Sequence, residues 1–302
     1  MPHELALRET LAAVELDHGE ELILRTRSGD TRRLALLGTD ASIHSSNLAE
    51  TGPGPAARVV LRMTAHLEID GSPVTLVRWV GSQESFYRPW KLFGLRVWFD
   101  ACQALFQHLA ENHGPCRPRK QARFAFQELD RGICPILLHP WCPLPPRGLR
   151  IEDCYQGSDC WLGPYFGVDA HGGLDINHPA GTLLWTPIPI DDHGYFESLA
   201  TGANNNRWRS IHRWPDGSTW ILQSHHLVRL LVPEHQPIPA GTLYAESAGV
   251  YVGSHEHTHF TFAVVEPGAG LDQAIRLDPW ILFQQMYADR RRTRAAGRVG
   301  RP

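Results

Sequence analysis

The sequence predicts a mainly β protein with a few helices, and three observations support this fold class. In the first third, stretches such as residues 20–30 and 57–81 alternate apolar and polar residues and are broken by Gly, Asp and Pro, a pattern typical of antiparallel strands. Short segments of the same kind resume after about residue 150 and continue to about Pro267. Only two segments carry a helical period. We therefore expect a β-rich N-terminal half with one helix, followed by a second β-rich half.

The first helix is predicted over residues 92–109, because apolar residues recur there at spacings of three and four. A second helix is predicted near the C-terminus, where Asp278 can cap it and Pro279 suits its first turn. Residues 68–74 have the composition of a hairpin turn between two strands. The apolar stripe of the first helix is interpreted as core and consists of Leu95, Trp98, Phe99, Cys102, Leu105, Phe106 and Leu109.

The chain of 302 residues exceeds the usual single-domain length, and prolines gather over residues 134–150 in what we interpret as an extended connection. This predicts an N-terminal β-rich domain over residues 1–150, of unknown role, and a second domain over residues 151–288. Residues 289–302 contain many arginines and no interleaved aromatic residues, so we expect a basic, flexible tail.

Composition excludes several classes of protein. A net charge of -3 gives no general field for nucleic acid, and no run of eighteen or more apolar residues could span a membrane. The first residues lack the basic and apolar regions of a secretory signal, so we expect a cytoplasmic protein unless a signal was removed. Of six cysteines, only Cys154 and Cys160 lie close together, and they form either a disulfide or two free thiols.

The stretch HGGLDINHPAGT, residues 171–182, places His171 and Asp175 four residues apart. On a helix this spacing would put both side chains on one face, but Gly172 and Gly173 disfavour a helix, each by about 1 kcal/mol relative to alanine. We interpret the glycines as letting the backbone bend, so that both side chains reach one ion from an irregular segment.

A second group of histidines lies in SHEHTHFTFAV, residues 254–264. Residues two apart on a strand point the same way, so one face should carry His255, His257, His259 and Thr261, and the other should carry Thr258, Phe260 and Phe262. This predicts a core face opposite a polar site. In the segment between the two groups, His225 and His226 are adjacent, so only one of them should face that site.

Zinc accounts for this combination of residues. A catalytic zinc ion typically takes three His or carboxylate ligands at about 2.0–2.2 Å and keeps a fourth position open for water. His171, Asp175 and one histidine of residues 254–264 would supply such a set. The remaining histidines could take a proton from the water or stabilise a tetrahedral oxyanion.

Three segments resemble motifs of the lysostaphin-like (LytM-type) zinc metallopeptidases. HGGLDINHPAGTLLWTPI is similar to their His-x-Gly-x-Asp segment and Gly-Thr turn, HTHF to their His-x-His-Phe strand, and HHL lies between them where the family has a His-Leu pair. The resemblance covers roughly residues 160–266. It implies an antiparallel β-sheet peptidase domain with a groove, Zn²⁺ bound by His171, Asp175 and His259, and catalytic roles for His226 and His257.

The resemblance also implies the substrate, namely peptide bonds of bacterial peptidoglycan, and hence a periplasmic or secreted location. Two positions depart from the family pattern: Ser224 stands where a tyrosine is frequent, and Glu256 where a small residue or proline is frequent. A second His-x-His pair, His255 with His257, leaves the register open, and Phe260 favours the later pair. His178 is interpreted as a turn residue.

Three functions are compatible with these motifs. The first is a zinc endopeptidase acting on peptidoglycan, with residues 1–150 as a positioning, inhibitory or wall-binding module. The second is a catalytically silent regulatory or binding module of the same fold. The third is a peptidase acting on another peptide. All five expected polar positions are filled, which favours an enzyme.

Overall fold

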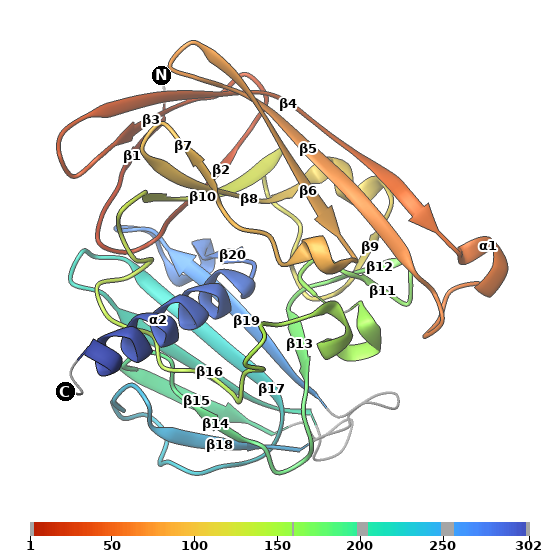
Figure 1. Ribbon diagram of the computed structural model, residues 1–302, viewed down its shortest axis with the longest axis vertical. Coiled ribbons are helices and arrows are strands. Elements are labelled where there is room, and N and C mark those ends of the chain that lie inside the picture. The colour runs from red at the N-terminus through yellow and green to blue at the C-terminus, as the bar shows by residue number, and fades with distance from the viewer. Residues whose placement is uncertain (1–2, 159, 198–204, 249–256, 300–302) are drawn as a thin grey trace.

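The computed structural model describes residues 3–158, 160–197, 205–248 and 257–299. These residues form mostly β-strands, which confirms the predicted fold class. In Figure 1 the N-terminal strands, red to yellow, lie above a C-terminal sheet, green to blue, and a long helix crosses that sheet. The helical segments are α1 (Leu48–Thr51), α2 (Trp280–Val299) and the 3₁₀ turns η1 (Gln83–Ser85), η2 (Gln103–Gln107), η3 (Ile151–Asp153), η4 (Tyr155–Gly157) and η6 (Leu271–Gln273).

The first sheet has five strands, in the order β1-β3-β4-β5-β6. Its strands alternate buried and exposed residues, as the sequence predicts. The predicted hairpin turn joins β5 to β6 at Asp70 and Gly71, whose φ angles of 49° and 79° suit a two-residue turn. The strands are β1 (His3–Ala6), β3 (Glu21–Arg25), β4 (Thr31–Ser46), β5 (Val59–Ile69) and β6 (Ser72–Val80).

The second sheet, in the order β2-β10-β8-β7, contains the segment for which we predicted a helix. That prediction is wrong: residues 92–109 form the end of β7, the strand β8 and the turn η2. Both faces of β8 are buried, since Phe99 packs in one hydrophobic core and Trp98 in another. Apolar residues on both faces of a strand also recur at three and four, and so imitate a helix. The strands are β2 (Ala12–Leu16), β7 (Trp90–Leu92), β8 (Leu95–Cys102) and β10 (Ala122–Glu128).

The C-terminal sheet has eight strands, with the main order β13-β19-β17-β16-β15; β14, β18 and β20 pair at its sides. A separate three-stranded sheet has the order β11-β12-β9. The C-terminal strands are β13 (Leu174–Asn177), β14 (Leu183–Trp185), β15 (Asp192–Phe196), β16 (Asn206–Arg213), β17 (Thr219–Leu230), β18 (Leu243–Ser247), β19 (His257–Val265) and β20 (Ile275–Leu277). The smaller sheet consists of β9 (Ala110–His113), β11 (Pro164–Tyr165) and β12 (Asp169–His171).

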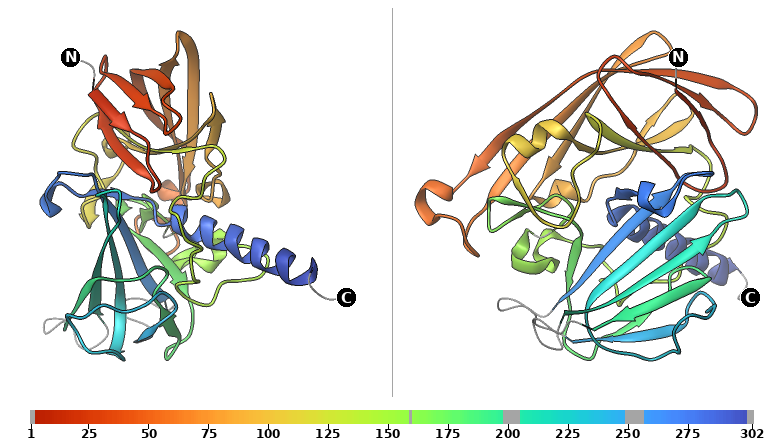
Figure 2. Two further views of the ribbon diagram at one scale, coloured as in Figure 1. Left: turned by 90° about the vertical axis from the view of Figure 1, so that its left-hand side faces the viewer. Right: turned by 180° about the vertical axis from the view of Figure 1, so that it is seen from behind.

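Helix α2 starts beside the C-terminal sheet and projects away from it towards the C-terminus (Figure 2, left). Phe260 of β19 packs against Phe283 of α2 with ring centroids 5.3 Å apart. The Oδ1 atom of Asp278 accepts a hydrogen bond of 2.8 Å from the backbone N–H of Trp280, which confirms the predicted cap. The helix then continues to Val299, so most of the segment expected as a flexible tail is helical. Arg and Ala are strong helix formers, and they extend the helix beyond its buried first turns.

Two hydrophobic cores each draw residues from both sides of residue 150. One joins Trp98 and Ala125 to the C-terminal sheet, and the other joins Trp161 and Ala170 to the N-terminal sheets. Strand β9 also pairs in parallel with β12. The two halves therefore share cores and a sheet, and the division into domains at residue 150 stays a prediction.

The side chain of Cys160 is buried and is a free thiol, not part of a disulfide. Burial raises its pKa to about 11, which makes it unreactive. Within the residues that the structure describes, no helix is both long and apolar enough to cross a membrane.

Candidate metal centre

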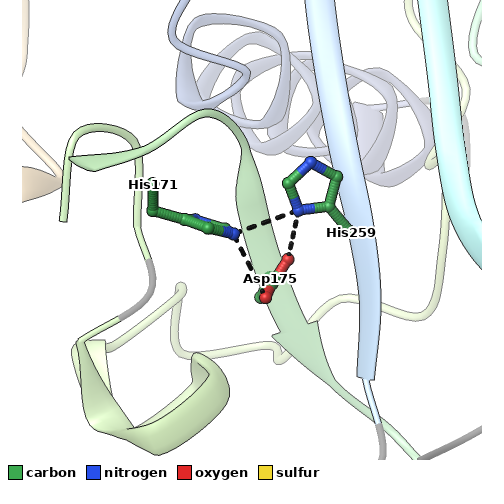
Figure 3. A group of neighbouring side chains, drawn as sticks. All are labelled: His171, Asp175 and His259. Carbon is green, nitrogen blue, oxygen red and sulfur yellow. Dashed lines mark hydrogen bonds and ion pairs between the residues drawn. The ribbon is translucent and has the colours of Figure 1, made fainter. Parts of the chain in front are cut away.

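Side chains from three strands converge on one point beside the C-terminal sheet. His171 at the end of β12, Asp175 in β13 and His259 in β19 each direct a polar atom towards the other two (Figure 3). The Nδ1 atom of His259 lies 3.1 Å from Nε2 of His171 and 2.7 Å from Oδ1 of Asp175. The Nε2 atom of His171 lies 3.3 Å from Oδ2 of Asp175. These are three of the five site residues expected from the sequence.

Strand register brings two of the three together. Asp175 lies directly opposite His259 in the antiparallel pair of β13 and β19, so their side chains project on the same face. His171 comes from a different sheet, and the chain passes from β12 to β13 through Gly172 and Gly173. The site therefore sits where two sheets meet.

The structure gives Gly173 a different role from the one expected. Its φ angle is not in the left-handed region, so glycine is not required there for a bend. A Cβ atom on Gly173 would instead lie 2.3 Å from Cε1 of His259 and 2.7 Å from the backbone oxygen of Phe260. Glycine is required because the ring of His259 occupies the space that a side chain would take.

The donor set fits a zinc ion. In a tetrahedral site with bonds of about 2.0–2.2 Å, neighbouring donor atoms lie about 3.3–3.6 Å apart, and the three observed separations of 2.7, 3.1 and 3.3 Å approach that range. Burial alone would raise the pKa of Asp175, but the charges of His171, His257 and His259 lower it well below its usual value. An ionised carboxylate and two imidazoles together form a donor set that suits zinc.

The two histidines expected to be catalytic lie beside this group. His257 is buried, and its Nε2 atom lies 3.4 Å from Oδ2 of Asp175. Its ring is also 4.3 Å from the ring of Tyr155 and 4.7 Å from the ring of His226, measured between centroids. Neither His226 nor His257 belongs to the group of converging donor atoms. The structure thus separates three inner residues from two flanking imidazoles.

The expectation that only one of His225 and His226 faces the site is wrong. Both side chains line the same pocket. His226 has a φ angle of 64°, and the pairing of β17 with β16 shifts register there, since Arg207 lies opposite His225 and Asn206 opposite Leu227. This left-handed residue interrupts the alternation of the strand, as bulges do. His225 lies directly opposite His259, with ring centroids 4.7 Å apart, and the sequence did not single it out as a site residue.

A pocket of about 480 Å³ opens over these histidines. Tyr155 and Tyr165 line it, as do Gly114 and Pro115 from the N-terminal half. Neither tyrosine could be predicted from the sequence, because both lie outside the three motifs and reach the pocket only through the fold. A cavity of this size accommodates several residues of an extended peptide.

The two departures from the family pattern have different outcomes. Ser224 is fully buried, and its Oγ atom is 2.8 Å from the hydroxyl oxygen of Tyr244, away from the pocket. His255 and Glu256 lie outside the described residues.

His178 directly follows β13 and forms a hydrogen bond with Thr258, consistent with a residue at a chain turn rather than in the pocket.

No family model and no curated relative matches the chain. Solved structures do match, at low identity. The antimicrobial peptidase lysostaphin from Staphylococcus simulans is 18% identical over 49% of this chain and 50% of its own, with a TM-score of 0.32, so the match spans about half of lysostaphin. A putative peptidase M23 from Pseudomonas aeruginosa is 15% identical over 91% of this chain and 93% of its own, with a TM-score of 0.32.

A zinc containing peptidase from Vibrio cholerae is 11% identical over 88% of this chain and 83% of its own, also with a TM-score of 0.32. The matching structures thus include lysostaphin, a member of the group whose motifs the sequence resembles. The proposed function rests on the motifs and on the geometry of the site, and not on these structural matches with low TM-scores.

Proposed function

We propose that the protein is a lysostaphin-like zinc metalloendopeptidase that hydrolyses peptide bonds of bacterial peptidoglycan, in a stem peptide or a cross-bridge. The observation that supports this most strongly is the convergence of His171, Asp175 and His259 beside two further imidazoles. The family resemblance of the motifs supplies the substrate class. A substrate outside the cytoplasmic membrane implies a periplasmic or secreted protein.

In this proposal, His171, Asp175 and His259 would hold the zinc ion through Nε2, a carboxylate oxygen and Nδ1. When bound, zinc supplies Lewis acidity that polarises a carbonyl group and lowers the pKa of water towards about 7. The ionised carboxylate of Asp175 would offset half of the charge of the zinc ion.

The two flanking histidines would have different roles: His257 would transfer protons, and His226 would stabilise the oxyanion. His257 lies against Asp175 and packs against the ring of Tyr155, and these two contacts hold its ring in one orientation. An imidazole in this position can accept the proton of the attacking water and return it to the leaving amine. His226, next to His257, would donate a hydrogen bond to the oxyanion of the tetrahedral intermediate.

The test is incubation of purified protein with peptidoglycan fragments, followed by mass spectrometry of the products. With added zinc we expect new peptide termini, and with a chelator we expect none. Unchanged fragments, with zinc bound to the protein, would contradict a peptidase and point to a silent binding module of the same fold.

A further inference from the structure

A second cavity, of about 320 Å³, continues the pocket along the same face of the C-terminal sheet. Pro115, Gln223 and Arg276 line both cavities. The two cavities together form a groove that runs from the metal centre over Gln223, and we call it the arginine groove. Its arginines are Arg117, Arg119, Arg123, Arg207, Arg209 and Arg276.

Strand register fixes where these arginines stand relative to the metal centre. Asp175, His259, His225 and Arg207 lie opposite one another in a row across β13, β19, β17 and β16. Thr261, Gln223 and Arg209 form the next row on the same face, and Arg276 of β20 stands opposite Ala263 in the row after that. Successive rows are about 7 Å apart, close to the advance of two residues in an extended peptide.

Two of the arginines are neutralised within the protein. Glu15 accepts hydrogen bonds from Arg119 at 3.2 Å and from Arg123 at 2.9 Å. Within the described part of the chain, by contrast, Arg207, Arg209 and Arg276 have no carboxylate within 4.0 Å. Asp272, the other acidic residue of the second cavity, is exposed and bonds none of them.

Arg276 is the most confined of the three. It is half-buried between the two cavities, with Nη1 close to Gly114. Burial lowers the pKa of Arg276, and the nearby charges of Arg209 and then Arg123 lower it further. Burying a cation next to like charges is unfavourable unless an anion balances it.

We propose that the arginine groove binds carboxylate groups of the substrate, so that Arg207, Arg209 and Arg276 select an acidic peptide and place its scissile bond at the metal centre. This rests on the proposed peptidase function and names its substrate class. The carboxylates lie about one to four residues from the scissile bond, as the spacing of the rows requires. Arginine suits them because its guanidinium donates two parallel hydrogen bonds to a carboxylate. Cationic peptides are disfavoured by the same charges.

The test measures binding separately from hydrolysis. Zinc-free protein is titrated with a cross-linked stem-peptide dimer that has free carboxylates, and with two forms in which either the side-chain carboxyls or the C-terminal carboxyl is amidated. We expect amidation of the recognised group to raise Kd about tenfold, and the two amidated forms show which source of carboxylate the groove reads. Raising the salt concentration should weaken binding of the acidic form alone.

Single substitutions test which arginines of the groove bind the carboxylates. Arg276→Gln and Arg209→Gln should each raise Kd for the acidic peptide about tenfold and leave Kd for the amidated peptide unchanged. Arg276→Lys should restore part of the affinity. Arg213→Gln is the control, because Arg213 is exposed on the same strand as Arg209 but lines neither cavity. Arg209 is also exposed, so its variant tests the proposal even if Arg276→Gln fails to fold.

Equal Kd values for acidic and amidated peptides, or variants that weaken both equally, would overturn the acidic substrate class. Hydrolysis of both peptides by zinc-loaded protein would then leave the peptidase function standing. Conversely, arginine-dependent binding without hydrolysis would support the groove and contradict the peptidase.

Discussion

His225 and His226 are consecutive residues of β17, yet both of their imidazole rings line the pocket of the metal centre. The φ angle of 64° at His226 breaks the strand alternation that would have sent one ring into the core. His225 thereby lies over His259, and His226 lies over His257, with ring centroids 4.7 Å apart in each pair. Four imidazoles therefore line the pocket together with His171 and Asp175.

This arrangement predicts different roles for the two neighbours. His226→Asn should lower kcat by about 10² to 10³, because it removes the imidazole proposed to donate a hydrogen bond to the oxyanion. His225→Asn should change kcat less than about tenfold, because His225 stands over His259 on the side of the arginine groove. Asparagine is the matched replacement, since it tolerates the left-handed backbone of His226. Hydrolysis kinetics on a peptidoglycan peptide, with zinc content measured in parallel, check this. A larger loss in the His225 variant would reverse the assignment.

Gly173→Ala should weaken zinc binding without unfolding the protein. The added Cβ would lie 2.3 Å from Cε1 of His259, so that ring must move away from the donor set. We expect zinc affinity to fall about 10- to 100-fold, as when the support of a ligand is removed. Competition with a chromogenic chelator measures the affinity. Gly38→Ala is the control, because nothing lies within 4 Å of its added Cβ. Equal zinc affinities in both variants would contradict the role assigned to Gly173.

The buried ion pair between Arg78 of β6 and Asp278, the cap of α2, links the two halves of the chain. Arg78→Ala should lower the free energy of unfolding by about 3–5 kcal/mol, because it leaves a buried carboxylate without its partner. Arg25→Ala should leave it nearly unchanged, since Arg25 and Glu4 are 52% and 54% exposed. Urea unfolding of the two variants checks the contrast, and a small effect of Arg78→Ala would argue against this link.

His178 should make stability depend on pH. Burial lowers its pKa to about 3, with a further contribution from His257, whereas the unfolded value is 6.5. Between these values the unfolded chain binds a proton that the folded chain does not. The free energy of unfolding therefore falls as the pH drops below about 6.5, by up to ~1.4 kcal/mol per pH unit, and is fully retained above it.

Urea unfolding at pH 7 and pH 5 measures this effect in the wild type and in His178→Gln. We expect the wild type to lose more stability between the two pH values than the variant does, because glutamine does not titrate. An identical loss in both proteins would show that His178 does not contribute.

The sequence predicts the metal centre better than it predicts the surrounding fold. Residue types and spacing pointed to His171, Asp175 and one histidine of residues 254–264, and the resemblance to the lysostaphin-like family selected His259. The structure brings polar atoms of these three side chains together. The helix predicted over residues 92–109 was wrong for a reason that lies in tertiary structure: a strand between two cores has no polar face. Periodicity alone does not distinguish such a strand from a helix.

Other parts of the site depend on contacts between distant segments. The pairing of β9 with β12 ties the strand that carries His171 to the N-terminal half, and no local pattern signals it. Arg276 reaches the groove only because β20 pairs with β19. Likewise, the backbone of His226 is left-handed, a conformation that histidine tolerates but that few histidines adopt. Such features follow from the assembled sheet and were not readable from spacing.

The most direct test of the metal centre is elemental analysis of tag-free protein prepared without chelators. We expect about one zinc ion per chain in the wild type, loss of zinc and hydrolysis together in His171→Ala and Asp175→Ala, and retained zinc with lost hydrolysis in His257→Ala. Zinc well below one per chain that does not rise on adding zinc, or unchanged hydrolysis in His257→Ala, would contradict the account.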